Sequence, residues 1–248
     1  MTGTPAPAIP APDRARRLFA ELLGSLLLAA IVVGSGIAAQ RLSPTDVGLQ
    51  LTENAIATAF GLLALILIFA PLSGAHFNPV VSLVDAAFGQ RPWRDALAYV
   101  PAQVLGCTLG AILANLMFEL PPVTLSSTER MTGAHFLSEV VATAGLVLVI
   151  FLLVRTGRGR FAPAAVAAYI GAAYFFTSST SFANPAITIG RAVTDTFAGI
   201  APSSVPGYLA AQVLGGVLGF AIVRLLSPAS AADSAAAPLP EHAARTGA

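Results

Sequence analysis

The sequence predicts an all-α membrane protein with six transmembrane helices and two re-entrant half-helices, arranged as an inverted repeat of three plus three spans. The composition gives the first observation: 56% of the 248 residues are hydrophobic and 10% are charged, with a mean hydropathy of +0.78. Soluble domains of this length carry far more charge. The second observation is a pair of Asn-Pro boxes, and the third is a similarity between residues 99–110 and 208–219.

The chain divides into two tails and a membrane domain. Residues 1–13 and 228–248 are rich in Ala, Pro and small polar residues, which predicts disordered cytoplasmic tails. Residues 14–227 are expected to form one membrane domain, with repeat one at about 14–118 and repeat two at about 134–227. The six apolar segments expected to cross the membrane are 18–39, 55–72, 96–118, 136–154, 161–176 and 208–226.

Each Asn-Pro box predicts the start of a helix. The boxes read Asn78-Pro79-Val80 and Asn184-Pro185-Ala186. Asn is a preferred N-cap, and Pro suits the first helical position because its missing N–H is not needed there. The apolar stretches that follow, 81–88 and 187–198, are far shorter than the ~20 residues that cross a bilayer. They are therefore expected to be half-helices, whose loops line a pore or a solute site.

The second half of the chain repeats the first without gaps. The matched positions are Tyr99, Gln103, Gly106 and Gly110 with Tyr208, Gln212, Gly215 and Gly219. Because each repeat has three spans, the second copy must enter the membrane from the opposite side. The half-helices would then meet near the midplane. The glycines are interpreted as close helix-packing positions, and Cys107 as a buried packing residue that excludes a disulfide.

The arginines orient the chain. All thirteen basic residues are Arg, and ten fall on one side of a six-span arrangement. By the positive-inside rule both termini are cytoplasmic and the loop at 119–132 is outside. The expected location is the cell (inner) membrane. A cleaved signal peptide is not favoured, because the first apolar segment exceeds the 7–15 residues of such a signal and contains Glu21.

Six spans with Asn-Pro-Ala-like boxes after the second and fifth resemble the aquaporin and aquaglyceroporin (major intrinsic protein) family, over roughly residues 14–226. Residues 73–80 are close to that family's first box, and residues 176–187 resemble bacterial members associated with arsenic handling. The resemblance implies a passive channel for water and small uncharged solutes: glycerol, urea or neutral metalloid hydroxides such as arsenous acid. It also implies a homotetramer in the lipid bilayer, with no enzymatic activity, cofactor or metal. The net charge of +1 gives no reason to expect nucleic acid.

The resemblance also assigns roles to residues. Asn78 and Asn184 would be the pore asparagines, with side-chain oxygens that cap the half-helices and NH₂ groups that donate to the passing solute. Glu21 and Glu139 would brace the two loops; carrying protons, or facing water near the span ends, are the alternatives for these costly carboxylates. His76 would line or buttress the cytoplasmic vestibule, and a purely structural hydrogen bond is an equal alternative.

The chain departs from the family pattern at the outer constriction. Most members carry Arg directly after the second box, where this chain has Ile187, so the filter is expected to be uncharged and to admit solutes bulkier than water. Asp85 and Arg191, each seven residues after its Asn, are interpreted as polar ends of the half-helices. Val80 replaces the usual Ala of the first box. The candidates for the other filter positions are Phe60, Ala172 or Tyr174, and Ser181.

Two other function classes stay open. An ion- or proton-coupled secondary transporter also uses inverted repeats and broken helices. It would need a coupling site, for which Glu21, Glu139 and Asp85 are the candidates. A non-conducting membrane scaffold would not need paired asparagines.

Overall fold

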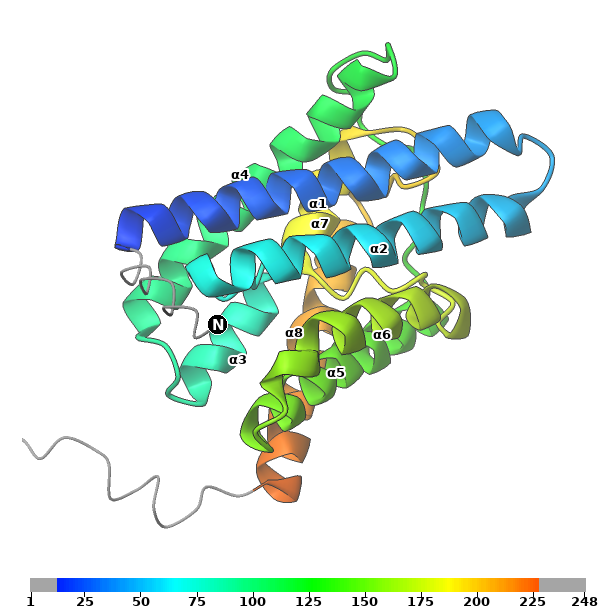
Figure 1. Ribbon diagram of the computed structural model, residues 1–248. Coiled ribbons are helices and arrows are strands. Elements are labelled where there is room, and N and C mark those ends of the chain that lie inside the picture. Colours follow the sequence, from blue (N-terminus) through cyan, green and yellow to red (C-terminus); the bar gives the residue numbers. More distant parts are fainter. Residues whose placement is uncertain (1–12, 228–248) are drawn as a thin grey trace, which may run out of the picture.

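The computed structural model describes residues 13–227, and within this range the ordered elements are all helical (Figure 1). The predicted tails at 1–13 and 228–248 lie outside this range, apart from residue 13. The α-helices are α1 (Arg14–Leu42), α2 (Val47–Ser73), α3 (Pro79–Ala87), α4 (Trp93–Met117), α5 (Gly133–Arg155), α6 (Ala162–Phe176), α7 (Pro185–Gly190) and α8 (Val205–Leu226). Two 3₁₀ turns, η1 (Gly159–Phe161) and η2 (Arg191–Val193), precede α6 and follow α7.

Five of the described helices are long and apolar enough to cross a membrane, namely α1, α2, α4, α5 and α8. The fifth predicted span corresponds to α6, which has 15 residues and falls within the expected segment 161–176. At 1.5 Å per residue it is roughly 22 Å long, which is less than the ~30 Å hydrocarbon core. The fifth expected segment therefore forms a helix, but one that needs neighbouring loop structure to complete the crossing.

Helix α2 starts eight residues before the predicted segment. The early turns contain Gln50 and Asn54, which are polar but buried. The side chain of Gln50 donates to the Ser43 carbonyl over 2.8 Å, and that of Asn54 donates to the Val32 carbonyl over 2.9 Å. These bonds to α1 and to the turn after it satisfy the amides, so the helix extends beyond its apolar core.

The first half-helix agrees with the prediction, and the second is shorter than predicted. Helix α3 covers nearly all of the expected stretch, whereas helical structure after the second box ends with η2 at Val193 rather than at Ala198. The reason is tertiary. The carbonyls of Ala192 and Val193 accept from Ser126 and Thr124 of the loop after α4, so the chain there follows that loop and leaves the helix.

The helices pack as two similar halves. Helix α1 packs on α4 and α2, helix α5 packs on α8 and α6, and α2 packs on α6 to join the halves. Figure 1 shows the α1–α2 hairpin above the α5–α6 hairpin, with α7 behind the α1–α2 hairpin. A Cβ at Gly106 or Gly110 of α4 would overlap the carbonyl oxygens of Leu22 and Leu26 in α1, which confirms the close-packing interpretation. Cys107 between them is fully buried, also as predicted.

Candidate functional site

Both asparagines of the boxes cap the helices that follow them. The Oδ1 atom of Asn78 accepts from the Val80 N–H over 3.0 Å, and Oδ1 of Asn184 accepts from the Ala186 N–H over 2.9 Å. Each Asn is followed by Pro at the first helical position. Both helices therefore begin as predicted, with an Asn cap followed by Pro.

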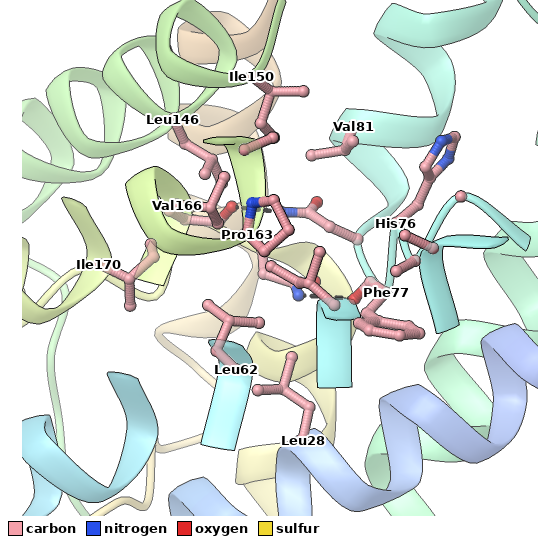
Figure 2. Close-up of a pocket in the computed structure, with 18 of the residues that line it drawn as sticks. Leu28, Leu62, His76, Phe77, Val81, Leu146, Ile150, Pro163, Val166 and Ile170 are labelled. Carbon is pink, nitrogen blue, oxygen red and sulfur yellow. Dashed lines mark hydrogen bonds between the residues drawn. The ribbon is translucent and has the colours of Figure 1, made fainter. Parts of the chain in front are cut away.

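The NH₂ groups of the same asparagines bond across the two halves. Nδ2 of Asn78 donates to the carbonyl of Ala183 over 2.8 Å, and Nδ2 of Asn184 donates to the carbonyl of Phe77 over 2.8 Å (Figure 2). The expectation that both NH₂ groups are wholly available to solute is therefore corrected. An amide carries two N–H donors, so one remains on each Asn.

The loops before the boxes share an unusual backbone. Six residues with positive φ, between +48° and +95°, precede the two asparagines: Gly74, Ala75 and Phe77, then Thr180, Ser181 and Ala183. Five of these are not glycine, and the left-handed region costs such residues free energy unless surrounding contacts impose it. The matching positions show that one loop structure is built twice.

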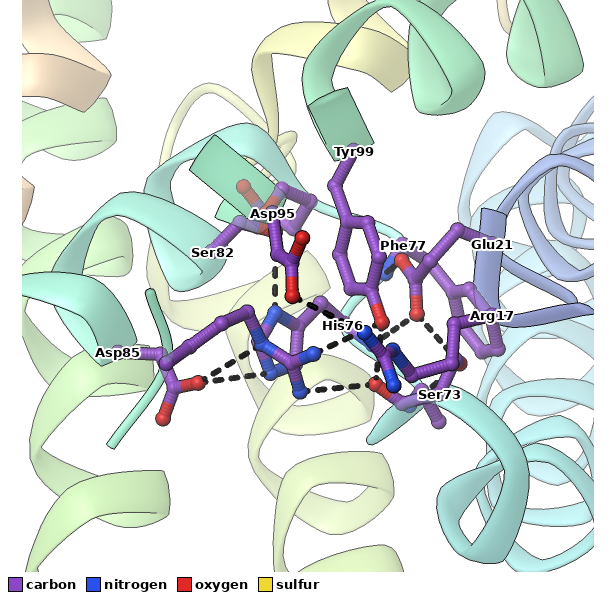
Figure 3. Close-up of polar contacts among 12 residues, drawn as sticks. Arg17, Glu21, Ser73, His76, Phe77, Ser82, Asp85, Asp95 and Tyr99 are labelled. Atoms are coloured by element: carbon purple, nitrogen blue, oxygen red, sulfur yellow. Dashed lines mark hydrogen bonds and ion pairs between the residues drawn. The ribbon is translucent and has the colours of Figure 1, made fainter. Parts of the chain in front are cut away.

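A buried carboxylate from the first span holds the first loop. Glu21 accepts from the N–H groups of His76 (3.0 Å) and Phe77 (2.7 Å). It also accepts from the Ser73 hydroxyl over 2.6 Å and from the Gln103 side chain over 2.8 Å (Figure 3). All four partners are donors, so the site fits a charged carboxylate.

The second half repeats this arrangement. Glu139 accepts from the N–H groups of Phe182 and Ala183, each over 2.9 Å. The Ser179 hydroxyl and the Gln212 side chain donate to it over 2.6 and 2.7 Å. Glu21 and Glu139 are absent from the lining of the central cavity, so each contacts its loop on the side that faces away from that cavity.

A cavity of about 410 Å³ runs between the two loops and the helices opposite them. Asn78 and Asn184 both line it, as do residues of both loops. The facing wall is aliphatic, and Figure 2 shows its labelled members Leu28, Leu62, Leu146, Ile150, Val166 and Ile170. One polar wall and one apolar wall let a small solute hydrogen-bond on one side only.

Two of the predicted filter residues do not line this cavity. Phe60 is 69% exposed on the outer surface of α2, and Ala172 of α6 is also exposed. Of the two candidates on α6, Tyr174 lines the cavity. On α2 Thr58 lines it in place of Phe60, and the hydroxyl oxygens of Thr58 and Tyr174 lie 3.1 Å apart. Residues two apart on a helix point roughly 200° away from each other, so the sequence reading had the wrong helical phase for Phe60 and Ala172.

Arg191, directly after the C-terminal end of α7, is a charged residue that the sequence analysis did not include among the filter candidates. Ile187 and Ser181 line the cavity as predicted, and Arg191 lines it too. The Arg191 guanidinium lies 3.4 Å from the centroid of the Phe182 ring, and its Nε donates to the Ala198 carbonyl. Arg191 is the first residue of the 3₁₀ turn η2, directly after α7. Because Arg191 lines the same cavity as Ile187, the cavity wall carries a guanidinium that the expectation of an uncharged filter did not include.

His76 lies on the cavity wall and also makes a polar contact within the first half-helix. The ring lines the cavity, and its Nδ1 lies 3.0 Å from the Ser82 hydroxyl. Its Nε2 lies 3.5 Å from a carboxylate oxygen of Asp85, which also lines the cavity and accepts from Arg91 over 3.1 Å (Figure 3). Each half-helix thus places a charged residue, seven positions after its Asn, on the cavity wall.

Ser181 carries a hydroxyl with no partner among residues 13–227, although the residue is buried. It lies in the loop that contributes to the cavity wall. A buried unpaired hydroxyl costs free energy unless a ligand or water satisfies it. The hydrogen-bonding capacity of this hydroxyl is therefore unused by protein atoms of residues 13–227.

Two half-helices whose N-terminal ends meet at a central cavity, inside a doubled set of apolar helices, define a multi-pass membrane protein built around a solute pathway. Comparison with known proteins identifies its family. The family profile described as Major intrinsic protein matches residues 9–183 and 163–247. The aquaglyceroporin AqpS of Rhizobium meliloti (strain 1021) is 51% identical, over 88% of this chain and 93% of its own length.

The glycerol uptake facilitator protein of Streptococcus pneumoniae (strain ATCC BAA-255 / R6) is 30% identical, over 84% of this chain and 97% of its own. The crystal structure of the aquaglyceroporin from Plasmodium falciparum shares the fold, with a TM-score of 0.65 at 21% identity, over 87% of this chain and 98% of that one. The chain belongs to the major intrinsic protein family, the aquaporins and aquaglyceroporins. Its members are channels and not enzymes.

Proposed function

We propose that this chain is a passive channel for water and small uncharged solutes. The observation that carries the proposal is the cavity that both box asparagines line, each with one N–H left to donate. The half-helix starts add partial positive charge at the same depth. Cations are repelled there, and successive waters are turned in opposite senses, which opposes proton relay.

The outer constriction in this proposal consists of Thr58, Tyr174, Ser181, Ile187 and Arg191. It combines hydroxyls and one guanidinium with an aliphatic side chain. Such a lining suits solutes that carry several hydroxyls on a compact apolar frame, such as glycerol, and neutral metalloid hydroxides such as arsenous acid. Urea, with amide donors and a carbonyl acceptor, fits the same lining. The printed names of the relatives, an aquaglyceroporin and a glycerol uptake facilitator, support this choice.

A coupled transporter is not favoured by the geometry. Glu21 and Glu139 spend their oxygens on loop donors and do not line the cavity. Asp85 does line it, but Arg91 donates to its carboxylate. No candidate carboxylate is therefore left free to bind a coupling ion.

The proposal extends to topology and assembly. Residues 14–227 form the channel domain in the cell (inner) membrane, with repeats at about 14–118 and 134–227. Both termini are cytoplasmic and the loop at 119–132 is outside, on the distribution of the arginines. Four copies form a homotetramer with one pore each, which the family and the exposed apolar side chains on α2 and α6 support.

Flux through reconstituted liposomes tests the function. Light scattering after an osmotic step is expected to show glycerol and water permeation at rates that do not change when a sodium or proton gradient is imposed. A passive pore has no coupling step, which is the physical reason. Solute accumulation against its own gradient, driven by either ion, would establish the transporter instead.

Replacement of Arg191 is expected to widen the range of solutes that pass. Arg191→Leu removes a long cation from the cavity wall, so permeability to glycerol should rise relative to water permeability, by roughly threefold to tenfold if the barrier falls by about 0.7–1.4 kcal/mol. Ile187→Arg makes the opposite change one turn away and should lower the same ratio. Stopped-flow swelling at matched protein density measures both.

Arg191→Lys is the control for this pair of variants, because it keeps the charge but loses the planar donor fork. It should lie between the wild type and Arg191→Leu. An unchanged solute-to-water ratio in Arg191→Leu, with normal protein level, would remove Arg191 from the constriction.

A further inference from the structure

A second, smaller concavity lies on the outer surface of the helix bundle. It encloses about 210 Å³ between α3, the start of α4 and α8, and it shares no lining residue with the central cavity. Its wall includes Val80, Leu83 and Val84 from α3, Trp93 from α4, and Gly216 and Phe220 from α8. We call this concavity the lateral groove.

The lateral groove depends on one departure from the family's first box. Val80, where the family usually has Ala, points away from the central cavity and into the groove. It fits because Gly216 has no side chain: a Cβ there would lie 2.5 Å from a methyl carbon of Val80. The groove wall therefore includes the first turn of the half-helix that Asn78 caps.

Two arginines are neighbours of residues that line the lateral groove. Arg94 follows Trp93 directly; its side chain is 80% exposed, and its Nε lies 3.9 Å from a carboxylate oxygen of Asp95. Arg224 is exposed one turn after Phe220, with its guanidinium 5.7 Å from the centroid of that ring. Trp93 itself is 53% exposed, as is typical of tryptophans at a membrane interface.

We propose that the lateral groove binds one acyl chain of an anionic phospholipid, whose headgroup contacts Arg94 and Arg224. The apolar wall of the groove suits the acyl chain of the lipid. The two guanidiniums suit a phosphate-bearing headgroup of net negative charge. A zwitterionic lipid matches the wall equally well but gains less from the arginines. The bound chain packs against Leu83 and Val84 and so supports α3 from the side opposite the pore.

Trp93 makes the test direct, because it is the only tryptophan in the chain. The full-length protein is reconstituted into phosphatidylcholine vesicles that contain a small, equal fraction of either dibrominated phosphatidylglycerol or dibrominated phosphatidylcholine. Bromine quenches tryptophan only at close range. We expect the anionic brominated lipid to quench Trp93 severalfold more than the neutral one.

Variants separate the contributions of charge and shape. Arg94→Gln combined with Arg224→Gln should abolish the preference for the anionic lipid and leave the weaker neutral quenching in place. Arg41→Gln, which removes an exposed charge over Phe118 at the opposite end of α4 from Trp93, should change nothing. Val217→Phe, at an exposed lining position of α8, should fill the groove and reduce quenching by the anionic lipid.

Two outcomes would overturn the proposal. Equal quenching by both lipids in the wild type would mean ordinary annular lipid without headgroup recognition. Quenching by neither lipid would mean that another protein surface, such as a second copy of the chain, covers Trp93. Solute flux measured on the same vesicles keeps the two proposals apart, since a working channel without lipid preference refutes only this one.

Discussion

Glu139→Leu is expected to leave little folded protein in the membrane. Four donors point at this carboxylate from Ser179, Phe182, Ala183 and Gln212, and a leucine would leave all four buried without an acceptor. Each unsatisfied donor costs about 1–3 kcal/mol, so the total exceeds about 4 kcal/mol. That is a large share of the ~5–15 kcal/mol that typically separates folded from unfolded protein.

The measurement is the yield and melting temperature of detergent-solubilised protein, followed by size-exclusion chromatography. Glu139→Gln keeps one acceptor oxygen and should fall between the wild type and the leucine variant. Glu119→Leu removes a carboxylate that is exposed and should behave like the wild type. A normal melting temperature for Glu139→Leu would show that the second loop keeps its shape without the brace.

Asn184→Leu is expected to reduce solute flux per folded channel by roughly fivefold to tenfold. It removes the cap of α7, the bond to the Phe77 carbonyl and the N–H that faces the cavity. Loss of the cap costs about 0.5–2 kcal/mol of stability, and the missing donor adds ~1–1.5 kcal/mol to the barrier that a solute must cross. The same change at Asn78 should have the same sign.

Asn184→Asp separates these roles, because a carboxylate still caps the helix but donates nothing. Its melting temperature should stay closer to the wild type, while its flux of neutral solutes should fall with that of Asn184→Leu. Flux is measured per channel after protein in the liposomes has been quantified. If both variants conduct as the wild type does, the paired asparagines are structural only.

Features that depend on residue type and local spacing were predictable from the sequence. An Asn followed by Pro needs only its own backbone to cap a helix, so the starts of α3 and α7 were expected. The contacts of Glu21 and Glu139 follow the same logic, because a carboxylate among apolar residues must find donors, and loops are where free N–H groups occur.

Features that depend on rotation and on distant partners were not predictable. The choice between Phe60 and Thr58 is a question of which face of α2 turns inward, and α2 is apolar on nearly every side. The early end of the helix after the second box depends on hydrogen bonds to the loop after α4, which lies about 70 residues away in the sequence. Local helix propensity cannot predict such distant contacts. Both errors arose where the sequence pattern is uniform and tertiary contacts decide.

The exchange of hydrogen bonds between the two asparagines has a consequence for biosynthesis. The Asn78 amide and the Phe77 carbonyl find their partners only in residues 183 and 184, more than a hundred positions later. Until the second half has been synthesised, the Asn78 amide and the Phe77 carbonyl therefore stay unpaired or bound to water. The centre of the molecule closes only when the second loop arrives, so a chain truncated after residue 118 would have no finished centre, however well its three spans insert.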